Sequence, residues 1–89
     1  MTLTIYSKEV CPYCINAKRF LDQHGIPYQE RRVDLDPANL EFIRDRGHRT
    51  VPQIYLGDEL FVEGGWDGLR AQDPSQLKLR LGITDLGAI

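Results

Sequence analysis

The chain has 89 residues, of which 42% are hydrophobic and 27% charged, as in an ordinary globular protein. This length predicts a single domain over residues 1–89, large enough to fold around one hydrophobic core. The formal net charge of −2 argues against a general attraction to nucleic acid or to anionic membranes.

The sequence lacks the patterns of export and of membrane insertion. Residues 1–6 contain no basic stretch followed by a long apolar run, so no signal peptide is predicted. No window approaches the roughly 18 consecutive apolar residues of a membrane-spanning helix. We therefore expect a cytoplasmic protein that does not bind membranes.

The first half of the chain predicts two strands with a helix between them. Residues 2–6 are rich in strand formers and predict a largely buried strand. A helix is expected from Pro12 to about Gln23, and Gly25 is suited to end it in a left-handed conformation. Residues 28–33 alternate in polarity and predict the second strand.

A short helix is expected next. Asp36 is a good N-cap with Pro37 at the first helical position, and Gly47 stops the helix. Residues 53–56 and 59–62 then flank a two-residue turn and predict a hairpin. A further helix should begin near Gly65-Trp66, after the hairpin.

The segment that begins at Asp73-Pro74 fits two structures. Every second residue is apolar at Leu77, Leu79, Leu81 and Ile83, and a strand would explain this alternation. We favour a helix that restarts at this point, because Leu77 and Leu81 are four residues apart and share one helical face.

The order of strand, helix, strand, helix, hairpin and helix predicts an α/β fold with a four-stranded mixed sheet and three helices (βαβαββα). The helix between the first two strands should connect them by a right-handed crossover and make them parallel, whereas the two strands of the hairpin are antiparallel. The turn after the first strand then lies at a carboxyl end of the sheet, where open α/β sheets keep their sites.

Cys11 and Cys14, the only cysteines, are separated by two residues at the junction of the first strand and the first helix. A cysteine just before a helix lies near unpaired N–H groups and the positive end of the helix dipole. Both stabilise the thiolate and lower the pKa of the thiol. Cys14, inside the first turn, can reach Cys11 to close a disulfide. The pair is interpreted as the redox couple of a thiol–disulfide oxidoreductase.

Two other interpretations of the cysteines are weaker. The first is a pair of buried structural thiols. The second is a zinc site, which needs four ligands, whereas only His24 and His48 remain as further soft donors and neither is spaced as in a zinc finger. No metal is expected.

Four separated motifs resemble those of the glutaredoxins, a family with the thioredoxin-like fold. The resemblance runs from Ile5 to about Leu69, and its motifs are Lys8, Cys11-Pro12-Tyr13-Cys14, Thr50-Val51-Pro52 and Gly64-Gly65-Trp66-Asp67. It implies a glutathione-disulfide oxidoreductase that uses glutathione as co-substrate to reduce protein disulfides and glutathione mixed disulfides. In that family Cys11 is the exposed nucleophile and Cys14 the resolving thiol.

The resemblance also implies a glutathione site. Lys8 and Arg49 would meet a carboxylate of glutathione, and a cis Val51-Pro52 bond would offer backbone groups to its cysteinyl residue. The amides that open the helix after Gly65 would receive the γ-glutamyl carboxylate. The predicted contacts are Lys8, Tyr13, Arg49, Thr50, Val51, Pro52, Gly65, Trp66 and Asp67.

Two departures from the family pattern support an alternative. Gly68 stands where family members commonly carry a second acidic residue, which leaves Asp67 to hold the γ-glutamyl ammonium. The pattern of Trp66 followed two positions later by Gly68 is similar to that of certain glutaredoxin-like redoxins. Those redoxins serve ribonucleotide reductase and are recharged by thioredoxin reductase. The alternatives are therefore an electron donor of that type, or a binding module or cluster scaffold without turnover.

Expected partners are glutathione and disulfide-containing or glutathionylated proteins, with ribonucleotide reductase a candidate, and we expect a monomer.

Overall fold

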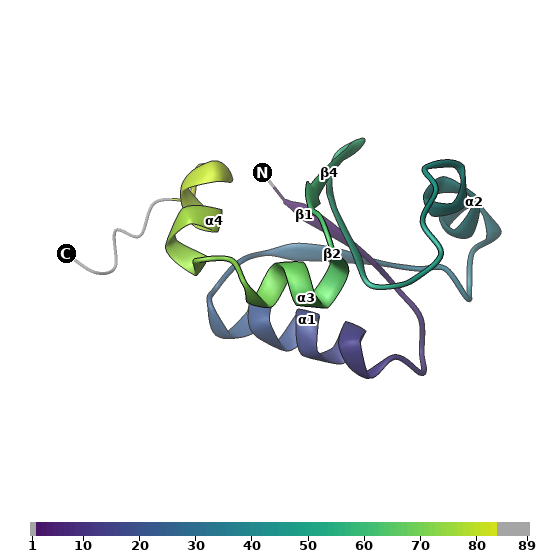
Figure 1. The fold of residues 1–89 in the computed structure, drawn as a ribbon, viewed down its shortest axis with the longest axis horizontal. Coiled ribbons are helices and arrows are strands. Elements are labelled where there is room, and N and C mark those ends of the chain that lie inside the picture. Colours follow the sequence, from purple (N-terminus) through teal and green to yellow (C-terminus); the bar gives the residue numbers. More distant parts are fainter. Residues whose placement is uncertain (1, 84–89) are drawn as a thin grey trace.

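The protein is described by a computed structural model that covers residues 2–83, so both ends of the expected domain lie outside the described residues. The elements follow the expected order in Figure 1. They are β1 (Leu3–Ser7), α1 (Pro12–Gln23), β2 (Tyr28–Arg32), α2 (Pro37–Asp45), β3 (Gln53–Leu56), β4 (Glu59–Val62), α3 (Gly65–Arg70) and α4 (Pro74–Arg80).

The strands form one mixed sheet in the order β2-β1-β3-β4. β1 pairs in parallel with β2, and β3 pairs antiparallel with both β1 and β4. The parallel pair follows from the crossover through α1, and the antiparallel pair follows from the short turn at Gly57, which has a φ of +62°. The predicted four-stranded mixed sheet is therefore confirmed.

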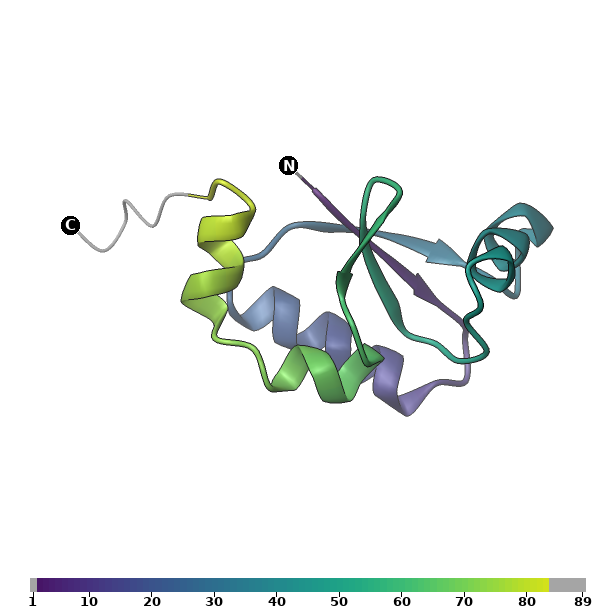
Figure 2. The ribbon, with the colours of Figure 1, turned by 45° about the horizontal axis from the view of Figure 1, so that its top comes forward.

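Helices cover both faces of the sheet. Neighbouring residues of a strand point to opposite faces. Ile5 belongs to a core cluster with residues of α1, α3 and α4, whereas Tyr6 packs with α2. Figures 1 and 2 show α1 and α3 side by side below the middle of the molecule, with α2 at one end and α4 at the other.

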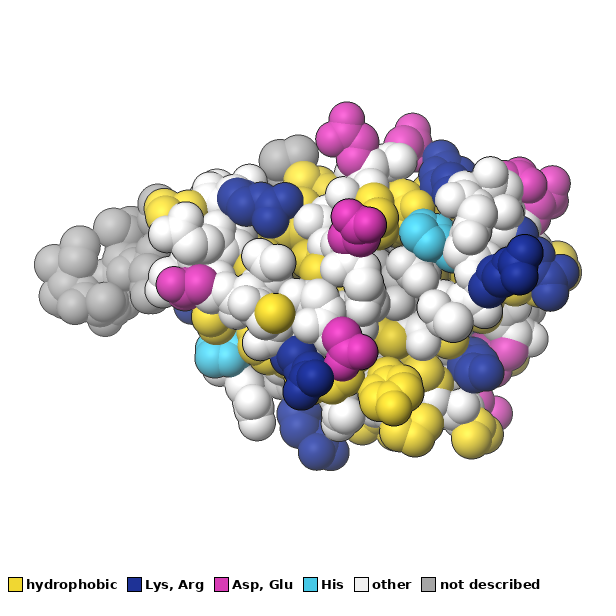
Figure 3. All heavy atoms as spheres, viewed as in Figure 1, with side chains coloured by type: hydrophobic (Ala, Val, Ile, Leu, Met, Phe, Trp, Pro, Cys, Tyr) yellow, Lys and Arg dark blue, Asp and Glu magenta, His cyan; other side chains and the backbone are white. Residues whose placement is uncertain are grey.

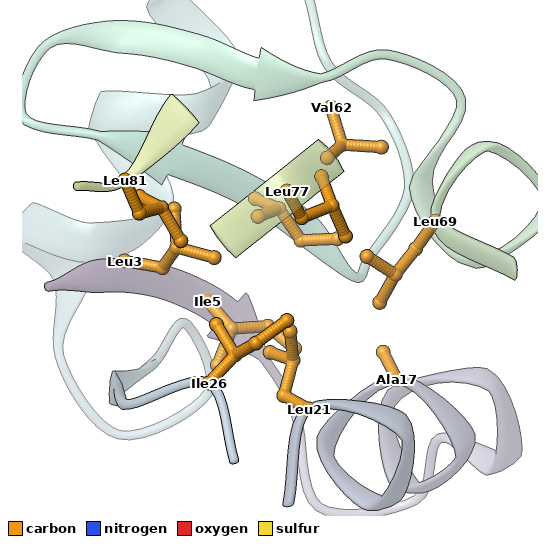
Figure 4. Close-up of a cluster of buried hydrophobic side chains, with 10 residues drawn as sticks. Leu3, Ile5, Ala17, Leu21, Ile26, Val62, Leu69, Leu77 and Leu81 are labelled. Atoms are coloured by element: carbon orange, nitrogen blue, oxygen red, sulfur yellow. The ribbon is translucent and has the colours of Figure 1, made fainter. Parts of the chain in front are cut away.

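The larger core lies between the sheet and three helices. Figure 4 shows apolar side chains from β1, α1, β4, α3 and α4 converging in one cluster. Its fully covered members include Leu3, Ile5, Ala17, Leu21, Ile54 and Leu69. Burial of this cluster holds α1 on the sheet, and it thereby fixes the position of the turn between β1 and α1.

The smaller core is aromatic and holds α2. The Tyr6 ring stacks on Phe42 with centroids 4.9 Å apart, and Tyr55 meets both rings edge-on. The Tyr55 hydroxyl lies 2.5 Å from Nε2 of His48, in the loop after α2. Burial raises the pKa of Tyr55, although the Arg46 guanidinium acts in the opposite direction. This cluster anchors the loop that leads into β3.

The helix count exceeds the prediction by one, because the segment after α3 is a separate helix. The Asp73 carboxylate accepts the Ser75 N–H at 2.9 Å, and Pro74 is the first residue of α4. Leu77 and Leu81 are buried, whereas Leu79 between them is 69% exposed. A strand would place all three on one face, so the period of two was the wrong signal and the favoured helix is confirmed.

Among residues 2–83 no helix combines the length and the apolar character needed to cross a bilayer.

Candidate active site

The two cysteines lie at the start of α1 and are joined by a disulfide. Cys11 is the N-cap residue, with an extended backbone, and Pro12 is the first helical residue. The Cys14 N–H points to the Cys11 sulfur at 3.1 Å, which makes this sulfur the capping atom of the helix. A negative charge on Cys11 would meet the same N–H group and the positive end of the helix dipole.

The prediction that Cys11 is exposed is wrong for this disulfide form. Cys11 is 5% exposed and Cys14 is fully covered. The cause is local, because the Cys11 sulfur accepts the Cys14 N–H of α1 and also lies 3.7 Å from the Val51 carbonyl oxygen. Cys11 is nevertheless the more accessible of the two sulfur-bearing residues.

A groove of about 220 Å³ brings together most of the predicted glutathione contacts. Its walls come from α1, from the loop before β3 and from the start of α3. The residues that line it are Tyr13, Thr50, Val51, Pro52, Gly64, Gly65, Trp66 and Asp67. Gly64 was quoted in the sequence motif but was not counted among the predicted contacts.

Lys8 and Arg49 do not line this groove. They lie in an adjoining hollow of about 170 Å³, and Thr50 and Val51 line both depressions. The structure therefore separates the predicted cationic contacts from the others by the width of the Thr50-Val51 loop. A ligand that contacts both groups of residues must cross this loop.

The loop before β3 lines the groove with Thr50, Val51 and Pro52. The Val51-Pro52 peptide bond is cis, as expected. The Gln53 side chain donates to the Thr50 carbonyl oxygen at 3.0 Å and ties the loop to the strand. Among residues 2–83 the Val51 N–H makes no loop hydrogen bond. It is therefore open to an extended ligand that adds alongside the loop.

The start of α3 closes the opposite wall. Gly64 and Gly65 have φ values of +92° and +58°. A Cβ atom at Gly65 would lie 2.9 Å from the Pro52 carbonyl oxygen, so a larger residue would push the wall away. Trp66 meets Phe20 edge-on at 6.1 Å, and it therefore packs on the core while lining the groove. The Asp67 carboxylate pairs with Arg70 at 3.1 Å.

A clamp that the sequence did not predict holds the loop between β1 and Cys11. An Asp34 carboxylate oxygen accepts the Glu9 N–H at 3.2 Å, and Arg32 holds the same carboxylate through two contacts of 2.7 and 2.5 Å. These contacts tie the loop that carries Lys8 to the end of β2. The Arg32 contacts lower the pKa of Asp34 to about 2, so the clamp is charged at neutral pH.

The titration of this clamp is directly measurable. The Asp34 pKa is lowered, so its stabilising effect is complete above the ordinary carboxyl pKa of 3.8 and is lost as pH falls toward about 2. We expect the Glu9 amide resonance to shift with a midpoint near about 2 in an NMR titration. Arg32→Gln should raise the midpoint toward 3.8, and a parent midpoint already at 3.8 would contradict the clamp.

Metal chemistry has no obvious site in the described part of the chain. Within residues 2–83, no three His, Cys, Asp or Glu side chains gather closely enough to hold a metal ion. The reactive group of the site is the Cys11–Cys14 disulfide. A Cys-x-x-Cys disulfide at the start of a helix, at the carboxyl end of a strand and opposite a cis-proline loop, defines a thiol–disulfide oxidoreductase of the thioredoxin-like fold.

Known proteins agree with this class. The family model for glutaredoxin matches residues 3–61. Glutaredoxin 3 of Escherichia coli is 43% identical over 70 residues, which cover 78% of this chain and 82% of that protein. The chain therefore belongs to the glutaredoxin family.

Two solved structures are also similar. A buckwheat glutaredoxin–glutathione complex is 30% identical, covers 98% of this chain and 80% of its own, and has a TM-score of 0.61. The glutaredoxin-like NrdH-redoxin of Escherichia coli is 26% identical, covers 89% of this chain and 93% of its own, and has a TM-score of 0.68.

Proposed function

We propose that this protein is a glutathione-dependent thiol–disulfide oxidoreductase that reduces protein disulfides and glutathione mixed disulfides. The observation that carries the proposal is the groove beside the dithiol, which Val51 lines and which has room for a short extended peptide; among residues 2–83 the Val51 N–H has no backbone partner. The buckwheat relative, which was solved in complex with glutathione, supports glutathione as that peptide.

The proposed reaction uses the two sulfurs in turn. The Cys11 thiolate attacks the glutathione sulfur of a mixed disulfide and releases the protein thiolate, which takes a proton from water. A second glutathione thiolate then attacks the Cys11 adduct and releases glutathione disulfide. With a protein disulfide, Cys11 binds one client sulfur, and Cys14 attacks Cys11 to release it. Two glutathione molecules then reduce the Cys11–Cys14 disulfide.

The proposed ligand lies across the Thr50-Val51 loop. Its cysteinyl backbone pairs with Val51, and its γ-glutamyl end reaches Trp66 and Asp67 in the groove. Its glycine carboxylate reaches Lys8 and Arg49 in the adjoining hollow. This placement accounts for the separation of the cationic contacts from the others.

Removing either cation should weaken glutathione binding. We expect Lys8→Gln and Arg49→Gln each to raise KM for a small glutathione mixed disulfide by up to about fivefold, because exposed ion pairs contribute up to about 1 kcal/mol. Arg19→Gln removes a charge on the outer face of α1 and serves as the control. Equal KM values in all three variants and the parent would contradict the placement.

A second candidate function is an electron donor driven by thioredoxin reductase, with ribonucleotide reductase as a candidate client. The observation in its favour is that Trp66, which meets Phe20 edge-on, forms part of the groove wall two residues before Gly68. The similarity to NrdH-redoxin, whose structure is described as showing a thioredoxin-like activity profile, adds support.

One comparison decides between the two functions. The disulfide form is reduced by glutathione with glutathione reductase, or by thioredoxin reductase, and the consumption of NADPH is followed in each assay. We expect turnover with glutathione. Turnover with thioredoxin reductase alone would establish the second candidate and refute the first.

We further propose that residues 1–89 act as one domain, as a monomer and in the cytoplasm. The support is the single sheet with helices on both faces, together with dithiol chemistry that needs a reducing compartment. Gel filtration at several concentrations tests the monomer.

A further inference from the structure

Two hollows beside the Thr50-Val51 loop are lined by basic side chains. Arg44, His48 and Arg49 line both of them, and Lys8 lines the one nearer the loop. We call Lys8, Arg44, His48 and Arg49 the basic groove. The larger hollow has a volume of about 430 Å³, which leaves room for several side chains of a partner.

No carboxylate lines the basic groove among residues 2–83. In the same part of the chain, Lys8, Arg44 and Arg49 form no ion pair, whereas Arg32, Arg46 and Arg70 each have an acidic partner. Figure 3 shows Lys and Arg side chains gathered over the end of the molecule that carries α2, with acidic side chains at its edge. A net charge of −2 makes this local excess of positive charge a specific feature.

The basic groove overlaps the proposed glutathione site at Lys8 and Arg49. Thr50 and Val51 line both the glutathione groove and the nearer hollow, and the Cys11 sulfur lies 3.7 Å from the Val51 carbonyl oxygen. The glycine carboxylate of glutathione would reach only Lys8 and Arg49. Arg44 and His48 line the same hollow as these two residues, and with Arg49 they also line the larger hollow, which Lys8 and the Thr50-Val51 loop do not line. One glycine carboxylate therefore leaves Arg44 without an assigned partner.

We infer that the basic groove binds an acidic segment of protein clients, carried directly after the client cysteine. The inference rests on the proposed function, because the placement of glutathione sets the direction of the chain. A client that adds alongside Val51 in the same direction passes Lys8 and Arg49, and its following side chains reach Arg44. Carboxylates at those positions meet guanidinium groups, whereas lysines meet like charge.

Pre-reduced protein and synthetic peptides test this inference. Each peptide carries one cysteine as a mixed disulfide with thionitrobenzoate, followed by glutamates in one peptide and by glutamines in the other. The Cys11 thiolate attacks the peptide sulfur and releases coloured thionitrobenzoate. The Cys14 thiolate then attacks Cys11, releasing the peptide thiolate and leaving the Cys11–Cys14 disulfide. The first step gives a second-order rate constant without glutathione.

We expect the glutamate peptide to react about tenfold faster than the glutamine peptide at low ionic strength, since complementary charge accelerates encounter. The ratio should fall toward unity at high salt. A third peptide with its glutamates before the cysteine should show a smaller ratio. Equal rate constants at low salt, or a larger ratio for the third peptide, would overturn the inference.

Matched variants locate the effect. Arg44→Gln should reduce the glutamate-to-glutamine ratio several-fold, whereas Arg19→Gln, an equal change of charge on another face, should preserve it. Equal reduction in both variants would show a general charge effect and refute the basic groove. Glutathione turnover is measured separately, so its absence would refute the proposed function while the peptide ratio still reports on the groove.

Discussion

Cys11→Ser is expected to abolish both reactions of the protein. A serine hydroxyl is a far weaker nucleophile than a thiolate. Cys14 is fully covered, so it cannot replace Cys11 at the surface. Reduction of a glutathione mixed disulfide should fall to the rate of the uncatalysed exchange with glutathione. The measurement is NADPH consumption with glutathione reductase.

Cys14→Ser is the matched control, because it removes one sulfur at the other end of the same disulfide. It should retain the reduction of glutathione mixed disulfides, since glutathione itself can resolve the Cys11 adduct, and lose the reduction of protein disulfides that need an internal resolving thiol. Full activity of Cys11→Ser, or loss of both reactions in Cys14→Ser, would contradict the roles assigned here.

Gly68→Ala is expected to destabilise the protein by about 3 kcal/mol, although alanine favours helices elsewhere. A Cβ atom at Gly68 would overlap the backbone carbonyl of Glu63, which cannot move without shifting β4 or α3. For a domain of this size, such a loss lowers Tm by roughly 15 °C. Thermal unfolding followed by circular dichroism measures it.

Gly25→Ala separates this clash from the general cost of adding a side chain. Gly25 has a φ of +66° with no heavy atom near its missing Cβ, so the replacement costs only about 1 kcal/mol of left-handed strain. Gly68→Ala should therefore be clearly less stable than Gly25→Ala. The reverse order would contradict the packing of α3 against the end of β4. The same overlap means that this backbone leaves no room for a side chain at position 68.

Local signals predicted most of the fold because they act within a few residues. Pro12, Pro37 and Pro74 each occupy the first turn of a helix, after the caps Cys11, Asp36 and Asp73. Each cap accepts a backbone N–H from its own helix, so the sequence alone contains both partners. The hairpin turn is local in the same sense.

The period of apolar residues predicted less near the C-terminus. The alternation of leucines fitted a strand as well as a helix, and only packing separates them. Leu77 and Leu81 enter the core beside Leu3 of β1, while Leu79 faces solvent. That outcome depends on β1, which lies more than seventy residues away in the sequence.

The sequence motifs contain the residues that the structure gathers around one groove, but they do not give the arrangement of those residues. The sequence motifs identified the walls of the groove, yet they did not show that Lys8 and Arg49 lie beyond the Thr50-Val51 loop. The bond between Asp34 and the Glu9 N–H joins residues 25 positions apart, and nothing in the local pattern of either residue indicates it. An acidic residue just after an edge strand was the only available signal.

The central claim is that the helix start stabilises a negative charge on the Cys11 sulfur, and the Cys14→Ser variant, which has a single thiol, tests it directly. Its rate of alkylation by iodoacetamide is measured across a pH series. We predict a midpoint at least about one unit below 8.5, the value for free cysteine, because a backbone N–H and the helix dipole both meet that sulfur. A midpoint at or above 8.5 would contradict the account.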